Sequence, residues 1–425
     1  MENGAAFPAT YYTATRNRQD RFPPLTEELR TDVCVVGGGY TGIATALELA
    51  ARGFGVVLLE AHQIGWGASG RNGGQLLFGI CDHAKIEQRL GRDAAALFWR
   101  MGLESVQIVR EHIERYHIDC DLRWGSFDAA ITQRQFDRLR AFKAEQEQRG
   151  YPHALELVDR AQLPAVIGSG HYLGGLIDRG GGHLHPLNLC LGEAAAAAAL
   201  GARLFEHSTA LAVLPGERPQ VLTAQGRVSA EWVVLAGNAY LGRLEPRLYG
   251  QVLPAGSYIV ATEPLGALAA ELLPQNLAVA DQNVVLDYFR LSADNRLLFG
   301  GRCNYSGREP RDIAAVLRPR LVEVFPQLRH TRIDYAWGGQ LGISLNRIPQ
   351  LGRLPGNILY AQGYSGHGVG TTHLAGRVLA EAISGEGARL DLFNQIRHWR
   401  LPGGRWFASP ALALGMLYYR LLDLL

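Results

Sequence analysis

Residues 32–42 read Asp-Val-Cys-Val-Val-Gly-Gly-Gly-Tyr-Thr-Gly, and after a segment rich in small residues the chain continues as Val-Val-Leu-Leu-Glu60. An apolar strand, a glycine turn, a helix and a second strand ending in an acid are typical of a fold that binds the ADP half of a dinucleotide. Gly37 allows the tight turn, Gly39 lets the backbone approach a pyrophosphate, and Gly42 lets the helix pack on the strand. Glu60 follows where a carboxylate accepts from ribose hydroxyls. The predicted contacts here are Gly37, Gly39, Tyr40, Thr41, Gly42, Glu60 and Ala61.

A second glycine-rich loop follows the acid and reads Gly65-Trp-Gly-Ala-Ser-Gly-Arg-Asn-Gly-Gly-Gln75. A nicotinamide domain has no need of this loop, whereas extended FAD needs a second backbone wrap for its pyrophosphate and its ring. Arg71 and Asn72 add donors for phosphate or for a flavin edge. A plain surface loop is the alternative interpretation. The cofactor contacts predicted in this loop are Gly67, Ala68, Ser69, Arg71, Asn72, Gly73, Gly74 and Gln75.

A third strand, glycine turn and helix lie at residues 357–384, where the turn reads Gly-Tyr-Ser-Gly-His-Gly-Val-Gly370. A helix N-terminus carries about half a positive charge, which favours an anion such as reduced flavin in front of it. A helix start without a ligand is the alternative. A buried strand at 231–237 also ends in a glycine, as expected at the carboxyl edge of a parallel sheet. The remaining predicted cofactor contacts are Ala236, Gly237, Gly363, Tyr364, Ser365, Gly366, His367 and Gly368.

Composition bounds the class of protein. A chain of 425 residues is long enough for two domains, and a net charge of +2 with no long basic run predicts no nucleic-acid partner. The five cysteines include no CxxC pair, which fits reduced thiols in the cytoplasm. We expect no signal peptide and no membrane-spanning helix, because the required apolar runs are missing.

The order of the segments predicts an α/β Rossmann-like FAD-binding domain that is discontinuous, with an inserted α+β substrate domain built on an antiparallel sheet. Segments 257–262, 284–291 and 296–301 read as its strands, which would form one wall of a pocket, and 318–325 reads as a short helix. A further helix is expected to begin at Pro186, which suits a first helical position. Residues 1–29 are expected to form an arm. We assign 30–85, 160–245 and 345–400 to the FAD-binding domain, and 86–159 and 246–344 to the substrate domain.

Nearly the whole chain resembles the D-amino-acid-oxidase-like superfamily of FAD-dependent oxidoreductases. The resemblance is carried by residues 31–42, 67–75, 181–189, 236–241 and 362–369. Within the superfamily the chain most resembles the gamma-glutamylputrescine (gamma-glutamylpolyamine) oxidoreductases, although oxidases of cyclic secondary amino acids such as L-pipecolate share the same motifs. A flavoprotein subunit without amine turnover is the alternative from another class.

The resemblance implies oxidation of a C–N bond in a small amine or amino acid. FAD accepts a hydride, the imine is hydrolysed, and oxygen or a quinone is the final acceptor. We expect FAD to be bound non-covalently, because no cysteine stands in a context for attachment. Neither the oligomeric state nor the exact amine follows from the sequence.

Pocket residues are expected from the antiparallel sheet and from the third glycine turn. Tyr258, Tyr288 and Trp337 are candidates for the catalytic wall, with sheet or core packing as the alternative for each. Arg302 follows Gly300 and Gly301, and we expect it to bind a substrate carboxylate rather than to make a surface ion pair. His367 is the candidate proton relay beside the flavin, with an ordinary loop histidine as the alternative.

Two further features bear on partners. His183 and His185 have the spacing of a metal arm, but a turn before a helix explains them and no metal site is predicted. The tail at 401–425 is strongly apolar yet too interrupted to span a bilayer. We expect it to dock on the fold of a cytoplasmic protein, with peripheral contact to the inner membrane as the alternative.

Overall fold

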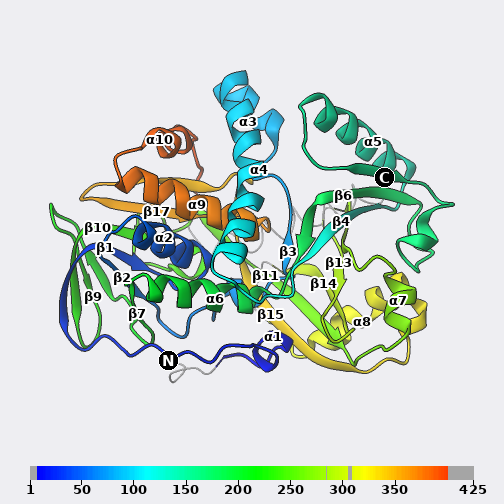
Figure 1. Cartoon of the computed structure of the whole chain (residues 1–425), viewed down its shortest axis with the longest axis horizontal. Helices are drawn as coiled ribbons and strands as arrows, with labels where there is room; N and C mark the ends of the chain where they lie inside the picture. Colours follow the sequence, from blue (N-terminus) through cyan, green and yellow to red (C-terminus); the bar gives the residue numbers. More distant parts are fainter. Residues whose placement is uncertain (1–6, 284, 305–308, 401–425) are drawn as a thin grey trace.

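Two large sheets lie toward opposite ends of the molecule's long axis in the computed structural model (Figure 1). The structure describes residues 7–283, 285–304 and 309–400. The largest hydrophobic cluster packs mainly on the first sheet but also includes Ile259, Leu298 and Trp337 of the second sheet, and the next largest lies against the second sheet. The predicted α/β architecture with a second, mainly antiparallel sheet is confirmed.

The first sheet contains parallel neighbours in the order β10 (Arg227–Leu235), β1 (Glu28–Val36), β2 (Val56–Leu59) and β7 (Arg203–Phe205), and β7 is an edge strand. Their apolar runs are buried, as parallel strands covered on both faces require. The sheet is completed by β17 (Ile358–Gln362), β16 (Gln350–Leu354), β9 (Gln220–Leu222) and β8 (Ala212–Leu214).

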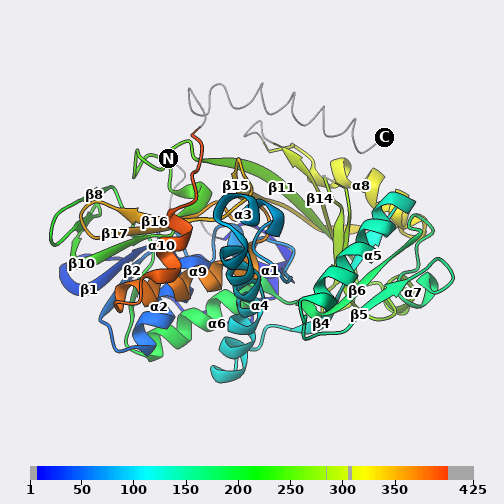
Figure 2. The same ribbon diagram turned by 90° about the horizontal axis from the view of Figure 1, so that it is seen from above.

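Helices with small, buried side chains cover one face of this sheet. They are α2 (Tyr40–Ala51), α6 (Pro186–Ala199) and α9 (Gly368–Ile383), and α2 packs against both α6 and α9 (Figure 1). The longer α4 (Arg92–Arg115) packs on α9. The start of α6 at Pro186 agrees with the sequence prediction. The shorter α3 (His83–Leu90) and α10 (Ala388–Asn394) lie near α4 and α9 (Figure 2).

The second sheet is mainly antiparallel and borders the other half of the molecule. Its order is β15 (Ile333–Ser344), β11 (Val252–Thr262), β14 (Leu297–Asn304), β13 (Tyr288–Leu291), β12 (Ala278–Asp281), β4 (Arg123–Ala130), β6 (Gly174–His183) and β3 (Gln75–Leu76), with β5 (Leu155–Val158) beside β6. Its helices are α5 (Gln133–Gln148), α7 (Leu268–Leu272) and α8 (Ile313–Val324).

Sheet membership differs from the expected segment boundaries at two places. The helix α4 falls in 86–159, which we assigned to the substrate domain, but it packs on α9 beside the first sheet. The strand β6 falls in 160–245, which we assigned to the FAD-binding domain, but it pairs with β4 in the second sheet. Neither element carries a local signal for its partner, because periodicity reports which face is buried and not what buries it.

Two element boundaries also differ from the prediction. The strand expected over 284–291 is only β13, which begins at Tyr288. The helix expected to begin at Arg318 begins at Ile313, because the Asp312 side chain accepts from the Ala315 N–H and caps an earlier start.

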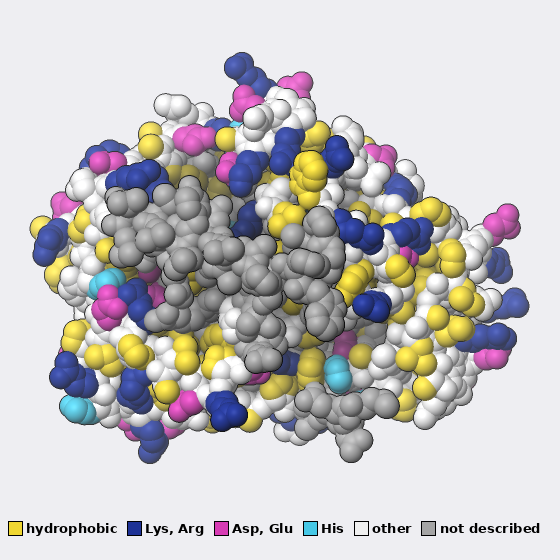
Figure 3. Space-filling model, turned by 180° about the vertical axis from the view of Figure 1, so that it is seen from behind, with side chains coloured by type: hydrophobic (Ala, Val, Ile, Leu, Met, Phe, Trp, Pro, Cys, Tyr) yellow, Lys and Arg dark blue, Asp and Glu magenta, His cyan; other side chains and the backbone are white. Residues whose placement is uncertain are grey.

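The N-terminal arm includes the short helix α1 (Tyr11–Ala14), where Tyr11 and Tyr12 are buried and the Arg290 guanidinium donates to the Tyr12 hydroxyl at 3.1 Å. On the face in Figure 3, basic and acidic side chains are dispersed among hydrophobic ones over the described surface. None of the described helices has the length and apolar character needed to cross a membrane. The prediction for the tail at 401–425 lies outside the described residues.

Candidate functional site

All three glycine-rich segments open into one cavity of about 1850 Å³. The cavity also reaches α3, α5 and strands β4, β12 and β13 of the second sheet, so both halves of the molecule border it. Its lining includes almost every predicted cofactor contact, namely Gly37, Gly39, Tyr40, Thr41, Glu60, Ala61, Gly67, Ala68, Ser69, Arg71, Asn72, Gly73, Gln75, Ala236, Gly237, Tyr364, Ser365, Gly366, His367 and Gly368.

Three predicted contacts shape the cavity without lining it. Gly42 packs against the first turn, where a Cβ would stand 1.9 Å from the Gly37 carbonyl oxygen. Gly74 has a φ of +71°, and a Cβ there would stand 2.1 Å from the Leu184 carbonyl oxygen. Gly363, with a φ of +77°, ends the strand before the third turn. These glycines allow backbone approach, so their role is to form the walls that other residues present.

The first turn forms a cradle at the start of α2. A Cβ on Gly39 would stand 2.8 Å from the Ser69 Oγ, which accepts from the Tyr40 N–H at 2.9 Å. The first glycine-rich turn and the second loop are therefore joined directly. The N-cap residue Gly39 has no side chain to cap the helix, and Ser69 takes only the Tyr40 N–H, so the start of α2 still borders the cavity, as a dinucleotide pyrophosphate requires.

Glu60 ends β2 beside this cradle. Its carboxylate accepts from the Gly38 N–H at 2.6 Å and from the His62 N–H at 2.8 Å. Burial raises the pKa of Glu60 despite these two bonds. Each carboxylate oxygen accepts more than one hydrogen bond, so Glu60 keeps acceptor capacity for ribose hydroxyls on its cavity side.

The second loop is held by its own side chains. The Asn72 amide donates to the Ala68 and Ser69 carbonyls at 3.1 and 2.9 Å, and its oxygen accepts from the Gly74 N–H at 2.7 Å. Arg71 donates from Nε to the Trp66 carbonyl at 2.8 Å and stacks over the Trp66 ring.

The second terminal nitrogen of Arg71, Nη2, is buried without a hydrogen-bond partner among the described residues. Burial lowers the pKa of this guanidinium. An orphaned buried donor in the cavity wall fits an anionic or carbonyl-bearing ligand. This donor, together with the first glycine turn and the glycine-rich loop at 65–75, fits the pyrophosphate and ring of FAD.

The third turn is strained where it faces the cavity. Ser365 has a φ of +54°, which is uncommon for a residue other than glycine. Its N–H donates to the Gly342 carbonyl at 2.8 Å, and its Oγ accepts from the Ser344 N–H at 3.1 Å, so strand β15 holds it in place. At Gly366, with a φ of +95°, a Cβ would meet no atom within 4 Å, so the backbone faces open space in front of α9.

His367 precedes α9 and exposes its ring to the cavity. Its Nε2 lies 3.3 Å from the Phe78 carbonyl oxygen, which can only accept. Nε2 therefore carries the proton, and Nδ1 is the acceptor in the neutral ring. Surrounding protein atoms lower the pKa of His367, so the neutral form is favoured.

The predicted wall residues are placed differently from one another. Tyr288 lines the cavity, and a Cβ on Gly73 would stand 2.7 Å from its ring. Tyr258 instead packs into the core behind the second sheet. Ser257 lines the cavity, and Tyr258, the next residue along β11, points to the other face because successive side chains alternate along a strand.

Trp337 does not line the cavity either. It is buried, and its Nε1–H donates to the Arg71 carbonyl at 3.0 Å, so it supports the second loop from behind. Arg302 belongs to β14, but its side chain lies outside the described residues. Its expected contact with a carboxylate stays a prediction.

Cavity residues that the sequence analysis did not single out include Asp128 and Gln282. The Gln282 amide donates to an Asp128 carboxylate oxygen at 3.1 Å. Burial and the neighbouring Asp178 raise the pKa of Asp128 to about 7. No local motif marks either residue, because sheet pairing alone brings them together.

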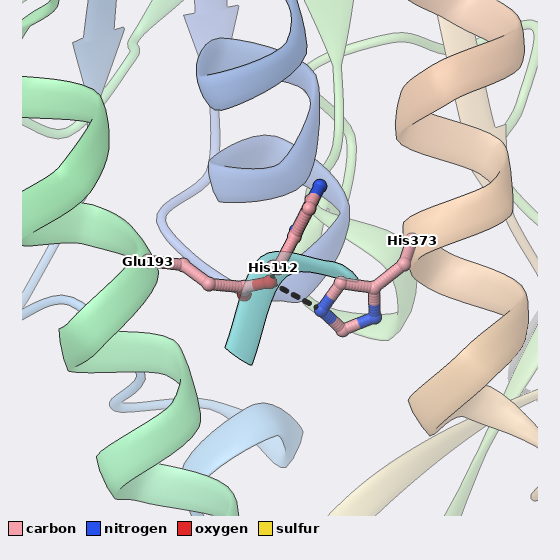
Figure 4. Close-up of side chains that lie close together, drawn as sticks. All are labelled: His112, Glu193 and His373. Atoms are coloured by element: carbon pink, nitrogen blue, oxygen red, sulfur yellow. Dashed lines mark hydrogen bonds and ion pairs between the residues drawn. The ribbon is translucent and has the colours of Figure 1, made fainter. Parts of the chain in front are cut away.

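A second group of titratable side chains, the helix-face cluster, lies away from the cavity. Glu193 on α6 accepts from His112 Nδ1 on α4 at 2.7 Å and lies 2.9 Å from His373 Nε2 on α9 (Figure 4). His112 Nε2 also lies 3.4 Å from Glu48 on α2, which pairs with Arg377. One potential ligand atom from each of His112, Glu193 and His373 lies within 4.8 Å of the other two, a spacing open to a metal ion.

The charges in the helix-face cluster stabilise each other. Burial raises the pKa of Glu193, but His373 and His112 lower it by more, so the resulting pKa is about 2. Burial lowers the pKa of His112, but Glu193 and Glu48 raise it to about 9. The cluster therefore carries paired charges at neutral pH and joins four helices.

The His183 and His185 pair has other partners. His183 Nε2 lies 2.9 Å from the Asn276 carbonyl, and His185 Nδ1 accepts from the Asn188 N–H at the start of α6. Burial, with the nearby Arg290, lowers the pKa of both rings to about 3.

Several known proteins are similar to this chain in sequence and in fold. The family described as FAD dependent oxidoreductase (DAO) matches residues 32–382. The gamma-glutamylputrescine oxidoreductase of Escherichia coli K12 is 46% identical over 418 residues, which are 98% of this chain and 98% of that protein.

Among solved structures, the glycine oxidase of Geobacillus kaustophilus superposes with a TM-score of 0.72 at 25% identity, over 87% of this chain and 100% of that one. The L-proline dehydrogenase of P. horikoshii gives a TM-score of 0.72 at 20% identity, over 86% and 96% of the two chains, and shows the shared fold.

Proposed function

The chain belongs to the DAO family of FAD-dependent oxidoreductases, with FAD as its cofactor, and from this membership we propose that it oxidises the terminal amine carbon of gamma-glutamylputrescine or another gamma-glutamylated polyamine. The similarity to the Escherichia coli enzyme along nearly the full length of both chains supports this substrate class. The division into an FAD-binding and a substrate domain is part of the same proposal.

The cavity is the observation that carries the proposal. Its volume of about 1850 Å³ exceeds the ~300–1,000 Å³ typical of sites for one small ligand. It runs from the three glycine-rich segments to polar residues of β4, β12 and α5. This extent has room for FAD and for an elongated substrate beside it.

The turns and loops that follow strands of the first sheet would hold FAD. The Gly37–Gly39 turn with the amides of α2 would hold the pyrophosphate, and Glu60 the ribose. Arg71 and the turn at 363–368 would face the flavin ring. When bound, FAD supplies the acceptor for a hydride from the carbon next to the amine nitrogen.

His367 is proposed to remove a proton from the substrate's ammonium group. Oxidation needs a neutral amine, because a positive nitrogen does not release electron density to its carbon. The Nδ1 lone pair is available, since Nε2 donates to the Phe78 carbonyl. The lowered pKa keeps His367 in the neutral form that accepts.

Tyr288 is proposed to position the reacting end of the substrate. Its ring lies against Gly73 of the second loop, and its hydroxyl lies 3.3 Å from the Ser257 Oγ. An aromatic ring at the meeting point of loop and sheet limits where a slender alkyl chain can lie. Arg302 is kept as the proposed partner of a substrate carboxylate.

Anaerobic mixing of the holoenzyme with candidate amines tests the proposal. Flavin absorbance should bleach fastest with gamma-glutamylputrescine, more slowly with free putrescine, and least with L-pipecolate, sarcosine and D-amino acids. Fastest bleaching by L-pipecolate would favour an oxidase of cyclic amino acids instead. A flavin that stays oxidised with all of them would contradict amine turnover.

A further inference from the structure

Asp128 stands at the end of a row that crosses three neighbouring strands. Tyr288 on β13 pairs with Ala280 on β12, and Ala280 pairs with Asp128 on β4. Directly paired residues point their side chains to the same face of a sheet. All three residues line the cavity, so the row forms part of its floor.

The row has a defined length and an open middle. Neighbouring strands lie about 4.8 Å apart, so Asp128 is roughly 10 Å from Tyr288 along the sheet. Tyr288 contacts the second glycine-rich loop, which marks the flavin end. The small Ala280 side chain between them leaves space for a chain to pass.

The environment of Asp128 lacks a positive charge. Its carboxylate accepts from the Gln282 amide, and none of the described residues places a cation against it. Asp178 on the next strand is satisfied differently, by the Tyr151 hydroxyl and the Gly180 N–H. A carboxylate half-buried in a cavity wall without a cation is costly unless a ligand supplies one.

We infer that Asp128, oriented by Gln282, binds the α-ammonium group of the glutamyl moiety and selects gamma-glutamylated amines over free ones. This inference rests on the proposed function, because it takes the reacting carbon to lie at the Tyr288 end. Asp128 is a specificity residue and takes no part in the oxidation.

The dimensions of the substrate fit this row. About nine bonds separate the carbon to be oxidised in gamma-glutamylputrescine from its α-ammonium nitrogen. An extended chain advances roughly 3.3–3.6 Å for every three bonds, which gives about 10–11 Å. In free putrescine the distal ammonium is only about four bonds, or roughly 5 Å, from the carbon to be oxidised, so it would reach Ala280 but not Asp128.

The test compares two amides with and without Asp128. Glutarylputrescine keeps the reacting amine, the amide and the carboxylate but lacks the α-amino group. Dissociation constants come from the concentration dependence of anaerobic flavin reduction. Wild-type holoenzyme should bind gamma-glutamylputrescine about 10- to 100-fold more tightly than glutarylputrescine, the range expected for a charge-assisted hydrogen bond.

In Asp128→Asn the ratio of the two dissociation constants should fall to near one. The limiting rate of flavin reduction should change by less than about twofold, which is small beside the loss of affinity expected for a charge-assisted hydrogen bond. Glu145→Gln is the matched control, because Glu145 also lines the cavity but pairs with Arg149. It should leave the ratio unchanged.

The outcomes separate this inference from the proposed function. Wild-type flavin that is reduced by neither amide contradicts the proposed function. Reduction by both amides with the same ratio in wild type and Asp128→Asn contradicts the role of Asp128 alone. If the variant does not fold, equal affinities of the wild type for the two amides still overturn the inference.

Discussion

Two carboxylates in this molecule meet opposite surroundings. Glu193 is fully buried among helices, and His112 and His373 hold its pKa down to about 2. Asp128 lies half-buried in the cavity wall, where burial and Asp178 raise its pKa to about 7. Glu193 has its counter-charges within the fold, whereas no described residue supplies one to Asp128.

This difference separates a structural group from a binding group. The helix-face cluster supplies its own counter-charges, so its loss should be felt in stability. Asp128 contributes an unbalanced charge that the folded protein tolerates, so its loss should be felt in ligand affinity. A buried or half-buried carboxylate therefore stabilises the fold or binds a ligand, depending on whether neighbouring residues supply its counter-charge.

Removing the charge of Glu193 should have the largest effect. Glu193→Gln leaves His112 without its main partner, and breaking a buried pair costs about 3 kcal/mol or more. Denaturant unfolding of the holoenzyme should show this loss, whereas Asp128→Asn should be neutral or slightly stabilising. Glu27→Gln, which removes an exposed pair with Arg203, is the control and should change stability by under about 1 kcal/mol. Equal stabilities of Glu193→Gln and Asp128→Asn would contradict the difference between a structural and a binding carboxylate.

The helix-face cluster should also make stability depend on pH. The pKa of His112 is raised to about 9 from 6.5, so its contribution is complete below pH 6.5 and is lost as the pH rises through 9. The pKa of Glu193 is lowered to about 2 from 4.5, so its contribution is complete above pH 4.5 and is lost as the pH falls through 2.

The stability difference between wild type and Glu193→Gln should therefore be greatest between pH 4.5 and 6.5. It should shrink by on the order of 2 kcal/mol by pH 9. Thermal unfolding across this range measures the change. A constant difference from pH 5 to 9 would show that the cluster's charges do not stabilise the fold.

At Asp128 the pH dependence should appear in affinity. The charged group that acts on the Asp128 carboxyl is Asp178, which itself feels His153, and the hydrogen-bond partner Gln282 is neutral. Asp128 must be ionised to pair with an ammonium, so the dissociation constant of gamma-glutamylputrescine should rise as the pH falls below about 7.

The rise should approach tenfold for each pH unit below 7. Glutarylputrescine is the control, since it carries the same reacting amine but no α-ammonium. The dissociation constant of glutarylputrescine should not show this rise below pH 7, and neither should the dissociation constants of Asp128→Asn for the two amides. Parallel pH profiles for the two amides in the wild type would contradict the pairing.

The smallest effect should come from removing metal ions. His112 and Glu193 are 2.7 Å apart, and His373 and Glu193 are 2.9 Å apart. These are hydrogen-bond distances, whereas two ligands on tetrahedral zinc with bonds of about 2.0 Å lie roughly 3.3 Å apart. Dialysis against EDTA should leave the melting temperature unchanged, and a fall restored by zinc would show that the cluster holds an ion.

The sequence predicted the parts of this protein that follow local rules. The glycine turns after β1 and β17, the loop at 65–75 and the helix starting at Pro186 all depend on backbone freedom and on the pattern of a few consecutive residues. Those rules need no knowledge of distant partners. The cofactor half of the cavity could therefore be outlined in advance.

The substrate half depended on strand pairing. Tyr258 was predicted for the wall, but the preceding residue Ser257 lines the cavity, and strand alternation therefore turns the Tyr258 side chain to the core. Trp337 was predicted for the wall as well, but it packs behind Arg71. A one-residue change of register moves a side chain to the other face of a sheet, and a single sequence does not reveal register.

By itself, the sequence determined the glycine turns typical of a dinucleotide-binding fold, because tight backbone approach is encoded in neighbouring residues. Only the tertiary structure placed Asp128 in one row with Tyr288, and Glu193 between two histidines from other helices. Those residues lie tens to hundreds of positions apart, and long-range pairing and packing alone decide which charges meet.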